Sequence, residues 1–173
     1  MLERFYPDEY LKSIDDIDFE MYYKNGIRGI ISDIDNTLVP HGAPADEHII
    51  EVFEKIHSLG IKTCLISNNQ EPRVTPFAEK VNSEYICNAH KPSTKNYIKA
   101  MEIMETDKNS TLFIGDQIFT DIWGANRAGI QTVMLEKINP KEEIQIVLKR
   151  IPEKFILWRW RKTRLKIEKE EIR

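Results

Sequence analysis

The sequence predicts an α/β fold: a doubly wound, three-layer sandwich in which helices cover both faces of a central parallel sheet. Short apolar runs alternate along the chain with longer segments in which apolar residues recur every three or four positions. This alternation of strand and helix patterns indicates βαβ crossovers and therefore a parallel sheet. Four of the apolar runs also lead into a polar cluster, as expected where ligand-binding loops follow the carboxyl ends of parallel strands.

The individual elements follow from these patterns. Five apolar runs are the strand candidates, and they lie at residues 27–34, 61–66, 84–87, 111–114 and 131–135. The helical periodicity between them predicts four helices, which lie at residues 46–59, 72–82, 93–104 and 118–128. Gly60 and Gly129 come just after two of these helices, where glycine readily ends a helix, and Pro72 suits the first turn of another.

The chain length of 173 residues suits a single domain. We expect residues 1–150 to form this domain, beginning with an acidic segment at residues 1–26. Residues 151–173 are expected to form a basic, tryptophan-containing tail that is helical, with Pro152 in its first turn. Within residues 149–166, eight basic residues stand against one acidic residue, although the net charge of the whole chain is −3. The chain therefore combines an acidic domain with a basic tail.

Composition sets further bounds on the class of protein. No apolar run approaches the roughly 18 residues of a membrane span, and the N-terminus lacks the basic start and apolar stretch of a secretory signal. We therefore expect a cytoplasmic protein. Cys64 and Cys87 each lie inside an apolar run, where a free cysteine packs as a small hydrophobic residue. The four histidines show no metal-ligand spacing, so a zinc site is not expected.

The most informative polar cluster is Ser32-Asp33-Ile34-Asp35-Asn36-Thr37-Leu38, at the end of the first apolar run. Residues two apart in a strand point to the same side, so Asp33 and Asp35 are expected to face one point. Two carboxylates held close together are costly unless a cation or a shared proton relieves them. A hard divalent ion such as Mg²⁺, which prefers oxygen ligands, would do so. The alternative is a solvated turn, since Asp, Asn and Thr all favour turns.

Three more clusters follow the next apolar runs, and they contain Ser67, Lys91 and the pair Asp116 and Asp121. Each has an ordinary alternative: Ser67 could cap the following helix, Lys91 could be a surface lysine, and Asp116 could belong to a turn. Together, however, the four clusters supply a nucleophile, neutralising donors and metal ligands at one edge of the sheet. Phosphoryl transfer needs this set of groups.

The four clusters, in this order, resemble the motifs of the haloacid dehalogenase-like (HAD) superfamily of phosphohydrolases. The resemblance covers about residues 27–135, and its motifs are Asp33-Ile34-Asp35-Asn36-Thr37, Ser67, Lys91 and Gly115-Asp116…Asp121. The phrases Asp-Asn-Thr-Leu, Ser-Asn-Asn and Gly-Asp-Gln-Ile-Phe-Thr-Asp-Ile look like the subfamily IIIA group often called YqeG-type. That group is related to the phosphatidylglycerophosphate phosphatases. The resemblance implies the HAD-like Rossmannoid fold and a phosphoric monoester hydrolase.

The resemblance also implies roles for the acidic residues. Asp33 would be the nucleophile that forms an aspartyl-phosphate, and Asp35 would be the general acid and base. Mg²⁺ would be held by Asp33, by the backbone carbonyl of Asp35 and by Asp116.

The remaining motif residues are expected around these acids. Ser67, Asn68 and Lys91 are the candidates for binding the phosphoryl oxygens and offsetting their charge. Asp121 would support the metal or Lys91 without binding substrate itself, and Thr37 would position or cap the loop.

In the resembling superfamily, large cap domains are inserted after the first motif or between the second and third motifs. Here the gaps from Asp33 to Ser67 and from Ser67 to Lys91 each have room for one helix and one strand. Neither gap can hold a folded domain of even ~50 residues, so no large cap domain is expected. An open site suits a bulky substrate, such as a macromolecule or a lipid head group, unless a partner subunit serves as a lid.

A phospho-acceptor receiver domain is the alternative from a different functional class. Receivers are also doubly wound and also use acids, a hydroxyl and a lysine, but they are switches rather than enzymes. They place the acceptor aspartate at the end of the third strand, where this chain has Cys87-Asn88-Ala89. A receiver also has no use for a carboxylate such as Asp35, two residues after the acceptor. The enzyme is therefore the preferred interpretation.

The basic tail mixes aromatic residues with cations, as in Trp158-Arg159-Trp160-Arg161-Lys162. This pattern is typical of an amphipathic helix at an anionic membrane surface, here the inner face of the membrane. A helix that packs its tryptophans on the domain and a helix that binds another partner are the alternatives; no RNA-binding motif favours nucleic acid. With the open site and the resemblance, the tail favours phosphatidylglycerophosphate as substrate. A soluble phosphate monoester is the alternative.

Overall fold

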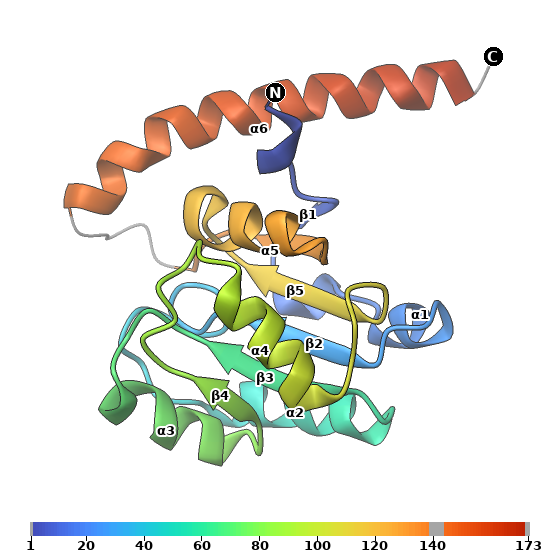
Figure 1. Ribbon diagram of the computed structural model, residues 1–173. Helices are drawn as coiled ribbons and strands as arrows, with labels where there is room; N and C mark the ends of the chain where they lie inside the picture. Colours follow the sequence, from blue (N-terminus) through green and yellow to red (C-terminus); the bar gives the residue numbers. More distant parts are fainter. Residues whose placement is uncertain (1, 139–143, 172–173) are drawn as a thin grey trace.

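The computed structural model describes residues 2–138 and 144–171, with side chains described for residues 2–138 and 152–165. Its middle layer is a parallel sheet of six strands in the order β1-β6-β5-β2-β3-β4 (Figure 1). The strands are β1 (Glu9–Leu11), β2 (Gly29–Ser32), β3 (Lys62–Ile66), β4 (Glu84–Ile86), β5 (Thr111–Gly115) and β6 (Gln131–Leu135).

The helices connect these strands and cover the sheet. The α-helices are α1 (Phe19–Lys24), α2 (Glu47–Ser58), α3 (Glu71–Lys80), α4 (Lys95–Met104), α5 (Trp123–Ala128) and α6 (Ile144–Glu171). The described residues also include three shorter turns, namely the 3₁₀ turns η1 (Glu3–Phe5) and η2 (Ile14–Asp16) and the π-helical turn η3 (Ile118–Ile122). No helix in the described part of the chain combines the length and the apolar composition that crossing a membrane requires.

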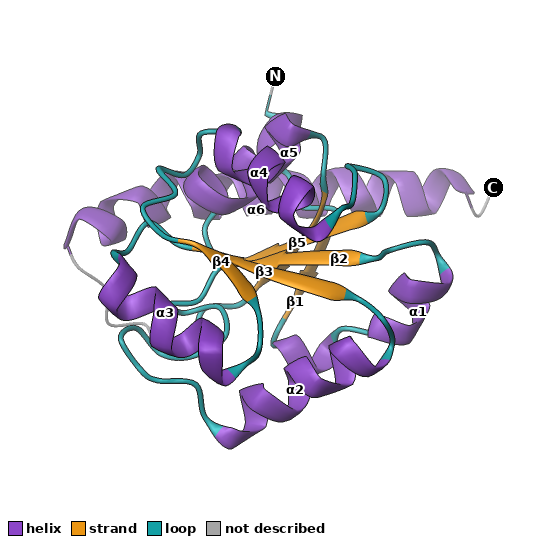
Figure 2. Cartoon of the chain, turned by 60° about the horizontal axis from the view of Figure 1, so that its bottom comes forward, coloured by secondary structure: helices purple, strands orange, loops and turns teal. Residues whose placement is uncertain are grey.

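The alternation of side chains along the strands produces the two cores. Ile30 and Leu112 belong to a cluster on one face of the sheet, together with residues of α2 and α3. Ile31 and Phe113, one position further along, belong to a second cluster with residues of α4 and α5. Figure 2 shows the two groups of helices on opposite sides of the sheet. The predicted doubly wound sandwich is therefore confirmed.

All five predicted strands and the four predicted helices are present, with ends that shift by a few residues. The predicted helix at 118–128 is divided into η3 and α5, and it ends at Gly129, whose φ of 75° is the left-handed conformation that favours glycine. The structure adds β1, which pairs with β6, and the short helix α1. β1 has only three residues and none of them is fully buried, so no apolar run in the sequence indicated this strand.

The tail differs from its prediction in one respect. Helix α6 begins at Ile144, so Pro152 lies inside the helix rather than in its first turn. Residues 151–171 of the expected tail therefore belong to one longer helix, which also spans the expected boundary after residue 150. The side chains of Lys149, Arg150 and Lys166, and residues 172–173, lie outside the described part of the chain.

The sheet brings the predicted polar clusters to one edge. In the register of the sheet, Ser32 at the end of β2 stands beside Leu65 of β3 and Ile114 of β5. Asp33 and Ser67 therefore follow their strands at the same edge. The connection from β2 to β3 contains α2, and the one from β3 to β4 contains α3, so neither connection holds a cap domain.

Candidate active site

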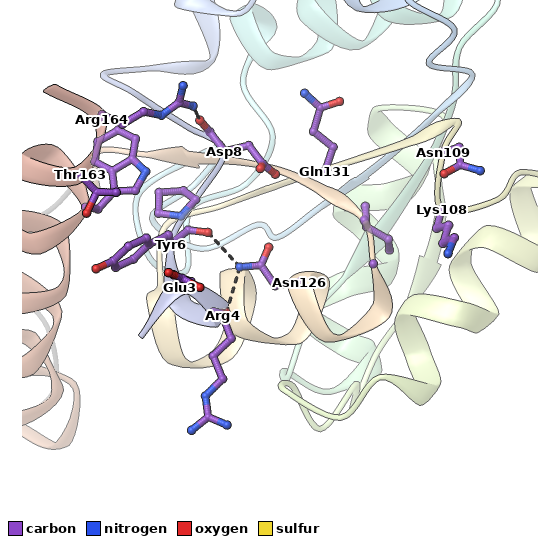
Figure 3. A pocket seen from close by; sticks show the side chains of 14 residues that line it. Glu3, Arg4, Tyr6, Asp8, Lys108, Asn109, Asn126, Gln131, Thr163 and Arg164 are labelled. Carbon is purple, nitrogen blue, oxygen red and sulfur yellow. Dashed lines mark hydrogen bonds between the residues drawn. The ribbon is translucent and has the colours of Figure 1, made fainter. Parts of the chain in front are cut away.

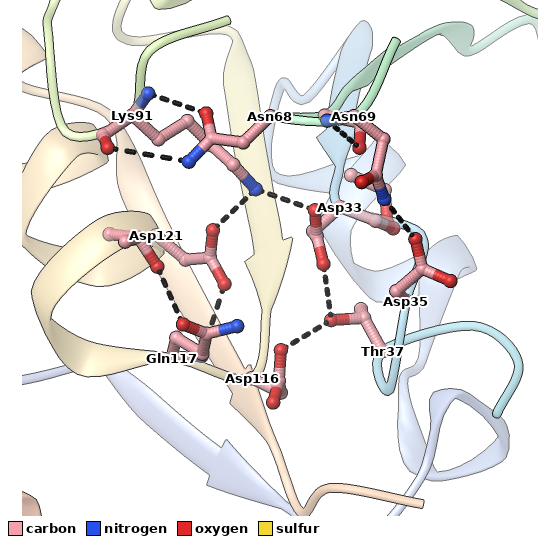
Figure 4. Close-up of polar contacts among 12 residues, drawn as sticks. Asp33, Asp35, Thr37, Asn68, Asn69, Lys91, Asp116, Gln117 and Asp121 are labelled. Atoms are coloured by element: carbon pink, nitrogen blue, oxygen red, sulfur yellow. Dashed lines mark hydrogen bonds and ion pairs between the residues drawn. The ribbon is translucent and has the colours of Figure 1, made fainter. Parts of the chain in front are cut away.

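A cavity of about 340 Å³ opens at the carboxyl edge of the sheet. It is lined almost entirely by polar side chains from the loops after β2, β3, β4 and β5, namely Asp33, Asp35, Asn36, His41, Ser67, Asn68, Asn69, Lys91, Gln117 and Thr120. Figure 4 shows most of these side chains converging from different loops. The predicted clusters are therefore one site in space.

Lys91 is the centre of the site. Its ammonium nitrogen Nζ donates to Asp33 Oδ1 at 2.5 Å and to Asp121 Oδ1 at 2.6 Å, and the residue is only 8% exposed (Figure 4). Burial by itself would lower the pKa of Lys91, but the two carboxylates raise that pKa above its ordinary value. The lysine is therefore a buried cation held by two acids, not a surface lysine.

Asp33 lies in the loop directly after β2 and is 6% exposed. Burial raises the pKa of Asp33 to about 6; Lys91 acts in the opposite direction, and the nearby charges of Asp121 and Asp35 raise the pKa further. A carboxylate in this setting is poorly solvated, which favours either protonation or the approach of a cation.

Three buried carboxylates form a group that fits a hard cation. Asp33, Asp116 and Asp121 each offer one oxygen, and these oxygens lie within 4.8 Å of one another. The Thr37 hydroxyl lies 3.2 Å from Asp116 Oδ1 and 3.4 Å from Asp33 Oδ2, and so links two of these acids. Carboxylate oxygens are the kind of ligand that Mg²⁺ prefers. Asp121, which was expected only in a supporting role, is thus also placed to contribute an oxygen.

The carboxylate of Asp35 is held apart from this group by donors from its own loop, from the loop after β3 and from helix α3. Oδ1 accepts from the backbone N–H of Gly42 at 2.7 Å and from Arg73 Nη2 at 2.9 Å, and Oδ2 accepts from Asn69 Nδ2 at 2.7 Å. The predicted metal contact of Asp35 concerns its backbone carbonyl, and that contact stays a prediction. The side chain lines the cavity and lies within reach of a group bound there.

Ser67 and Asn68 organise the loop after β3. The Ser67 Oγ accepts from the backbone N–H of Asn69 at 3.1 Å, which leaves its hydroxyl hydrogen to donate elsewhere. Ser67 does not cap α3, since the N-cap position of that helix is Gln70. Asn68 Oδ1 accepts from the backbone N–H of Lys91 at 2.7 Å, so the amide of Asn68 positions the lysine. The predicted contact of Asn68 with a phosphate therefore stays a prediction.

The loop after β5 is fixed from several directions. Asp121 Oδ2 accepts from the backbone N–H of Gln117 at 3.0 Å. The Tyr97 hydroxyl, on α4, lies 2.9 Å from the carbonyl oxygen of Thr120 and 3.1 Å from that of Asp121. Gly115 has no space for a side chain, because a Cβ there would lie 2.7 Å from the Cβ of Asp121. The glycine of this motif therefore allows Asp121 to lie close to the strand.

Several residues of the site were missed in the sequence. Asn69 stands inside one of the predicted clusters, so its neighbourhood was the signal. Arg73 and Tyr97 lie on helices, in positions that read as ordinary helical surface and core, and nothing in the local pattern pointed to the cavity. His41 lies 3.9 Å from Asp35 Oδ1 with a mostly exposed side chain.

Comparison with known proteins agrees with this geometry. A family model described as haloacid dehalogenase-like hydrolase matches residues 13–135. The chain is 41% identical over 137 residues to "Probable phosphatase YqeG" of Bacillus subtilis (strain 168), covering 78% of this chain and 80% of that protein. It is 27% identical over 173 residues to "Phosphatidylglycerophosphate phosphatase 1, chloroplastic/mitochondrial" of Arabidopsis thaliana, covering 92% of this chain and 49% of that protein.

A solved structure shows the same fold. The crystal structure of an uncharacterised protein from Listeria monocytogenes serotype 4b superposes with a TM-score of 0.52 at 18% identity, covering 68% of this chain and 86% of that one. The family model spans most of the chain, and the four motifs lie together at one edge of its sheet. The chain therefore belongs to the haloacid dehalogenase-like hydrolase family, which confirms both the resemblance and the expectation of an enzyme.

Proposed function

We propose that this chain is a Mg²⁺-dependent phosphatase that hydrolyses a phosphate monoester through an aspartyl-phosphate on Asp33. The observation that carries this proposal is the buried constellation in which Lys91 joins Asp33 to Asp121, beside Asp116. Such a site supplies a nucleophile, a fixed cation and oxygen ligands within one cavity. The identity to a protein named as a probable phosphatase supports the same reaction class.

Catalysis proceeds in two displacement steps. In the first, a carboxylate oxygen of Asp33 attacks phosphorus, the bond from phosphorus to the ester oxygen breaks, and Asp35 gives its proton to the leaving alcohol. In the second, Asp35 takes a proton from water, whose oxygen attacks the phosphorus and releases phosphate and the Asp33 carboxylate. General acid–base catalysis of this kind contributes about 10²- to 10⁴-fold.

The remaining residues bind and orient the phosphoryl group. The charge of Lys91 and the hydroxyl of Ser67 are suited to its non-bridging oxygens, whose negative charge they offset. Asp33 and Asp116, with the backbone carbonyl of Asp35, would hold Mg²⁺, and Asp121 is placed to assist. When bound, Mg²⁺ supplies positive charge that reduces the repulsion between a carboxylate nucleophile and an anionic substrate.

The outer face of α6 supports a location at a membrane surface. Phe155, Trp158 and Leu165 lie at helical spacing and remain 54%, 48% and 56% exposed. Their neighbours on the helix are basic, among them Lys154 and Lys162. An apolar stripe flanked by cations is suited to the surface of an anionic bilayer, which we place at the inner, cytoplasmic face.

The tryptophans of the tail divide between two of the predicted alternatives. Trp160 faces the domain and makes an edge contact with Tyr10 at 6.3 Å between ring centroids. Trp158 points away from the domain and stacks on Phe155, with the ring centroids 5.9 Å apart. The helix thus packs on the domain through one face and leaves the other exposed, as the proposed contact with a bilayer requires.

Phosphatidylglycerophosphate is the substrate that these features favour. The described connections from β2 to β3 and from β3 to β4 insert no cap domain, and the outer face of α6 suits an anionic lipid surface. A relative at 27% identity is named for this substrate. A soluble phosphate monoester is the second candidate, because the aspartyl-phosphate chemistry is the same for both.

The test is a phosphate-release assay with Mg²⁺ that compares phosphatidylglycerophosphate in anionic vesicles with a panel of soluble monoesters. We expect kcat/KM to be at least tenfold higher for the lipid, with no turnover by the matched variant Asp33→Asn. A soluble monoester that exceeds the lipid by this margin would replace the proposed substrate. Release of phosphate from neither class would contradict the proposed reaction itself.

A further inference from the structure

One acidic residue of the basic tail is buried against the active-site loop. Glu153 on α6 is 4% exposed, and its Oε1 accepts from the backbone N–H of Ile118 at 3.0 Å. Ile118 is the first residue of η3 and stands two positions after Asp116. The contact joins residues 35 positions apart in the sequence, so it is a tertiary contact between the tail and this loop.

The contact is physically significant because of where the N–H lies. The first backbone N–H groups of a helical segment have no partner within the segment, and a carboxylate is favoured there by the alignment of peptide dipoles. A buried carboxylate is itself costly unless it receives hydrogen bonds. Glu153 and Ile118 therefore stabilise each other. The segment that they fix carries Asp121, which holds Lys91 against Asp33.

The rest of α6 is attached so that Glu153 stays in place. Ile156, one turn further along the helix, packs in a cluster with Ile118, Ile122 and Met134. Trp160 contacts Tyr10. The helix is therefore held against η3 and β6 through Ile156 and against β1 through Trp160.

Further along α6, Arg164 donates to the backbone carbonyl of Asp8 (Figure 3). This contact lies at a second cavity of about 720 Å³, between α6, the N-terminal segment and α5, and away from the carboxylates of the active site. The helix is thus anchored to the domain at Glu153, Ile156, Trp160 and Arg164, which is more attachment than a mobile tail would have.

We propose that Glu153 is a positioning residue of the active site: by fixing the first N–H of η3, it holds Asp116 and Asp121 in the geometry that binds Mg²⁺. The tail is then part of the catalytic machinery as well as a surface for docking. The proposal rests on the proposed function in so far as Mg²⁺ is the ion that the acids bind. The role of Glu153 in fixing η3 does not depend on the metal.

The test uses the full-length protein and two readouts. The first is the dissociation constant for Mg²⁺, measured by isothermal titration calorimetry without substrate. The second is hydrogen–deuterium exchange of residues 116–122 in the metal-free protein. The variants are Glu153→Leu, which removes the acceptor but fills its space, and Glu153→Gln, which keeps a neutral oxygen acceptor. Ile98→Ala on the exposed surface of α4 and Ile156→Val in the packed face of α6 are the controls.

We expect Glu153→Leu to weaken Mg²⁺ binding about tenfold, as removal of an outer partner of a metal site typically does. Exchange of residues 116–122 should become faster in the same variant. Glu153→Gln should retain much of the affinity, with a loss of about threefold, and both controls should stay within twofold of the parent protein. If Glu153→Leu fails to fold, Glu153→Gln still has to show faster exchange and weaker binding.

Two results would overturn the proposal. One is unchanged Mg²⁺ affinity and unchanged exchange of residues 116–122 in the Glu153 variants. The other is an equal change in Ile156→Val, which would assign the effect to packing of the helix. If the parent protein itself binds no Mg²⁺, the proposed function fails, while the exchange measurement still decides the role of Glu153.

Discussion

Arg73 Nη2 lies 2.9 Å from Asp35 Oδ1 and thereby ties helix α3 to the general acid and base of the proposed reaction. The same nitrogen donates to the backbone carbonyl of Ala43 at 2.8 Å, and the guanidinium lies over the ring of Phe77 at 5.4 Å. These contacts fix the arginine, and the arginine in turn fixes the direction of the Asp35 carboxylate. Correct placement of a proton donor matters most when the leaving group is a poor one.

Replacing Arg73 should therefore have an effect that depends on the leaving group. For Arg73→Met we expect the rate of aspartyl-phosphate formation to fall about tenfold to a hundredfold with an alkyl monoester, which needs a proton on its leaving oxygen. With p-nitrophenyl phosphate, whose leaving group departs without a proton, the loss should be less than threefold. Single-turnover kinetics with both substrates measures the two rates. Arg73→Lys serves as the conservative control, and an equal loss with both substrates would show that Arg73 does not act through Asp35.

The pH dependence should report on Asp33. Because burial raises the pKa of Asp33 to about 6, and because the nucleophile and metal ligand must be ionised, kcat/KM should fall as the pH drops below about 6. A higher Mg²⁺ concentration should move this decline to lower pH, since the cation favours the ionised carboxylate. The pH profile of kcat/KM, measured at low and at saturating Mg²⁺, tests both statements. If the decline at low pH does not shift with the Mg²⁺ concentration, the group that titrates is not a metal ligand, which would contradict the role given to Asp33.

The same raised pKa has a consequence for stability. A carboxyl group whose pKa is higher in the folded than in the unfolded state favours folding when protonated, and this contribution is lost as the pH rises through the folded value. In the metal-free protein, Asp33→Asn should therefore raise the free energy of unfolding at pH 7.5 by on the order of 2 kcal/mol. The gain should shrink toward pH 4. Urea denaturation at the two pH values measures it, and a gain that is larger at pH 4 would contradict the sign.

Loss of a carboxylate from the group of three should act on metal dependence. We expect Asp116→Asn to raise the Mg²⁺ concentration needed for half-maximal activity at least tenfold, because an anionic ligand becomes a neutral one. Excess chelator should abolish activity of the parent enzyme, and Ca²⁺ should inhibit because it accepts a looser, higher coordination. Full activity in chelator would refute the metal requirement outright.

The exposed stripe of α6 should determine binding to vesicles. The double variant Trp158→Ser and Leu165→Ser should bind phosphatidylglycerol vesicles at least tenfold more weakly, since two apolar side chains no longer enter the bilayer. Ile98→Ala is the matched control, because Ile98 is 45% exposed on α4, away from the stripe. Binding of the parent protein should also weaken as salt screens the basic residues. Vesicle co-sedimentation measures each affinity. If neither salt nor the double substitution changes the affinity, the protein binds vesicles through another surface and not through this stripe.

The positions of Asp33, Ser67 and Asp116 could be predicted because each depends on a short-range pattern. An apolar run defines a buried strand, the strand's end defines an edge of the sheet, and the residue after the strand lies at that edge. Strand β1 escaped prediction for the same reason, since its three partly exposed residues carry no such pattern. A strand can thus be recognised from its pattern of apolar residues only where one or both of its faces are buried.

The contacts of Arg73 and Glu153 could not be predicted, because each depends on how distant elements pack. Arg73 reaches Asp35 from the first turn of α3, and Glu153 reaches Ile118 from a helix that was expected to be a separate tail. An acidic residue in a basic segment has no local feature that distinguishes a solvated side chain from a buried one. Glu153 is buried because α6 packs on the domain, and this packing is visible only in the structure.

Identification of the phosphorylated residue is the most direct test of the aspartyl-phosphate at Asp33. The enzyme is mixed with substrate and Mg²⁺, quenched in acid within milliseconds, reduced with borohydride to trap the acyl phosphate, and mapped by mass spectrometry. We predict that Asp33 is converted to homoserine in the parent enzyme and that no other residue is modified; Asp33→Asn should show no modification at all. Modification of Asp35, Asp116 or Asp121 instead, or turnover that continues in Asp33→Asn, would contradict this account.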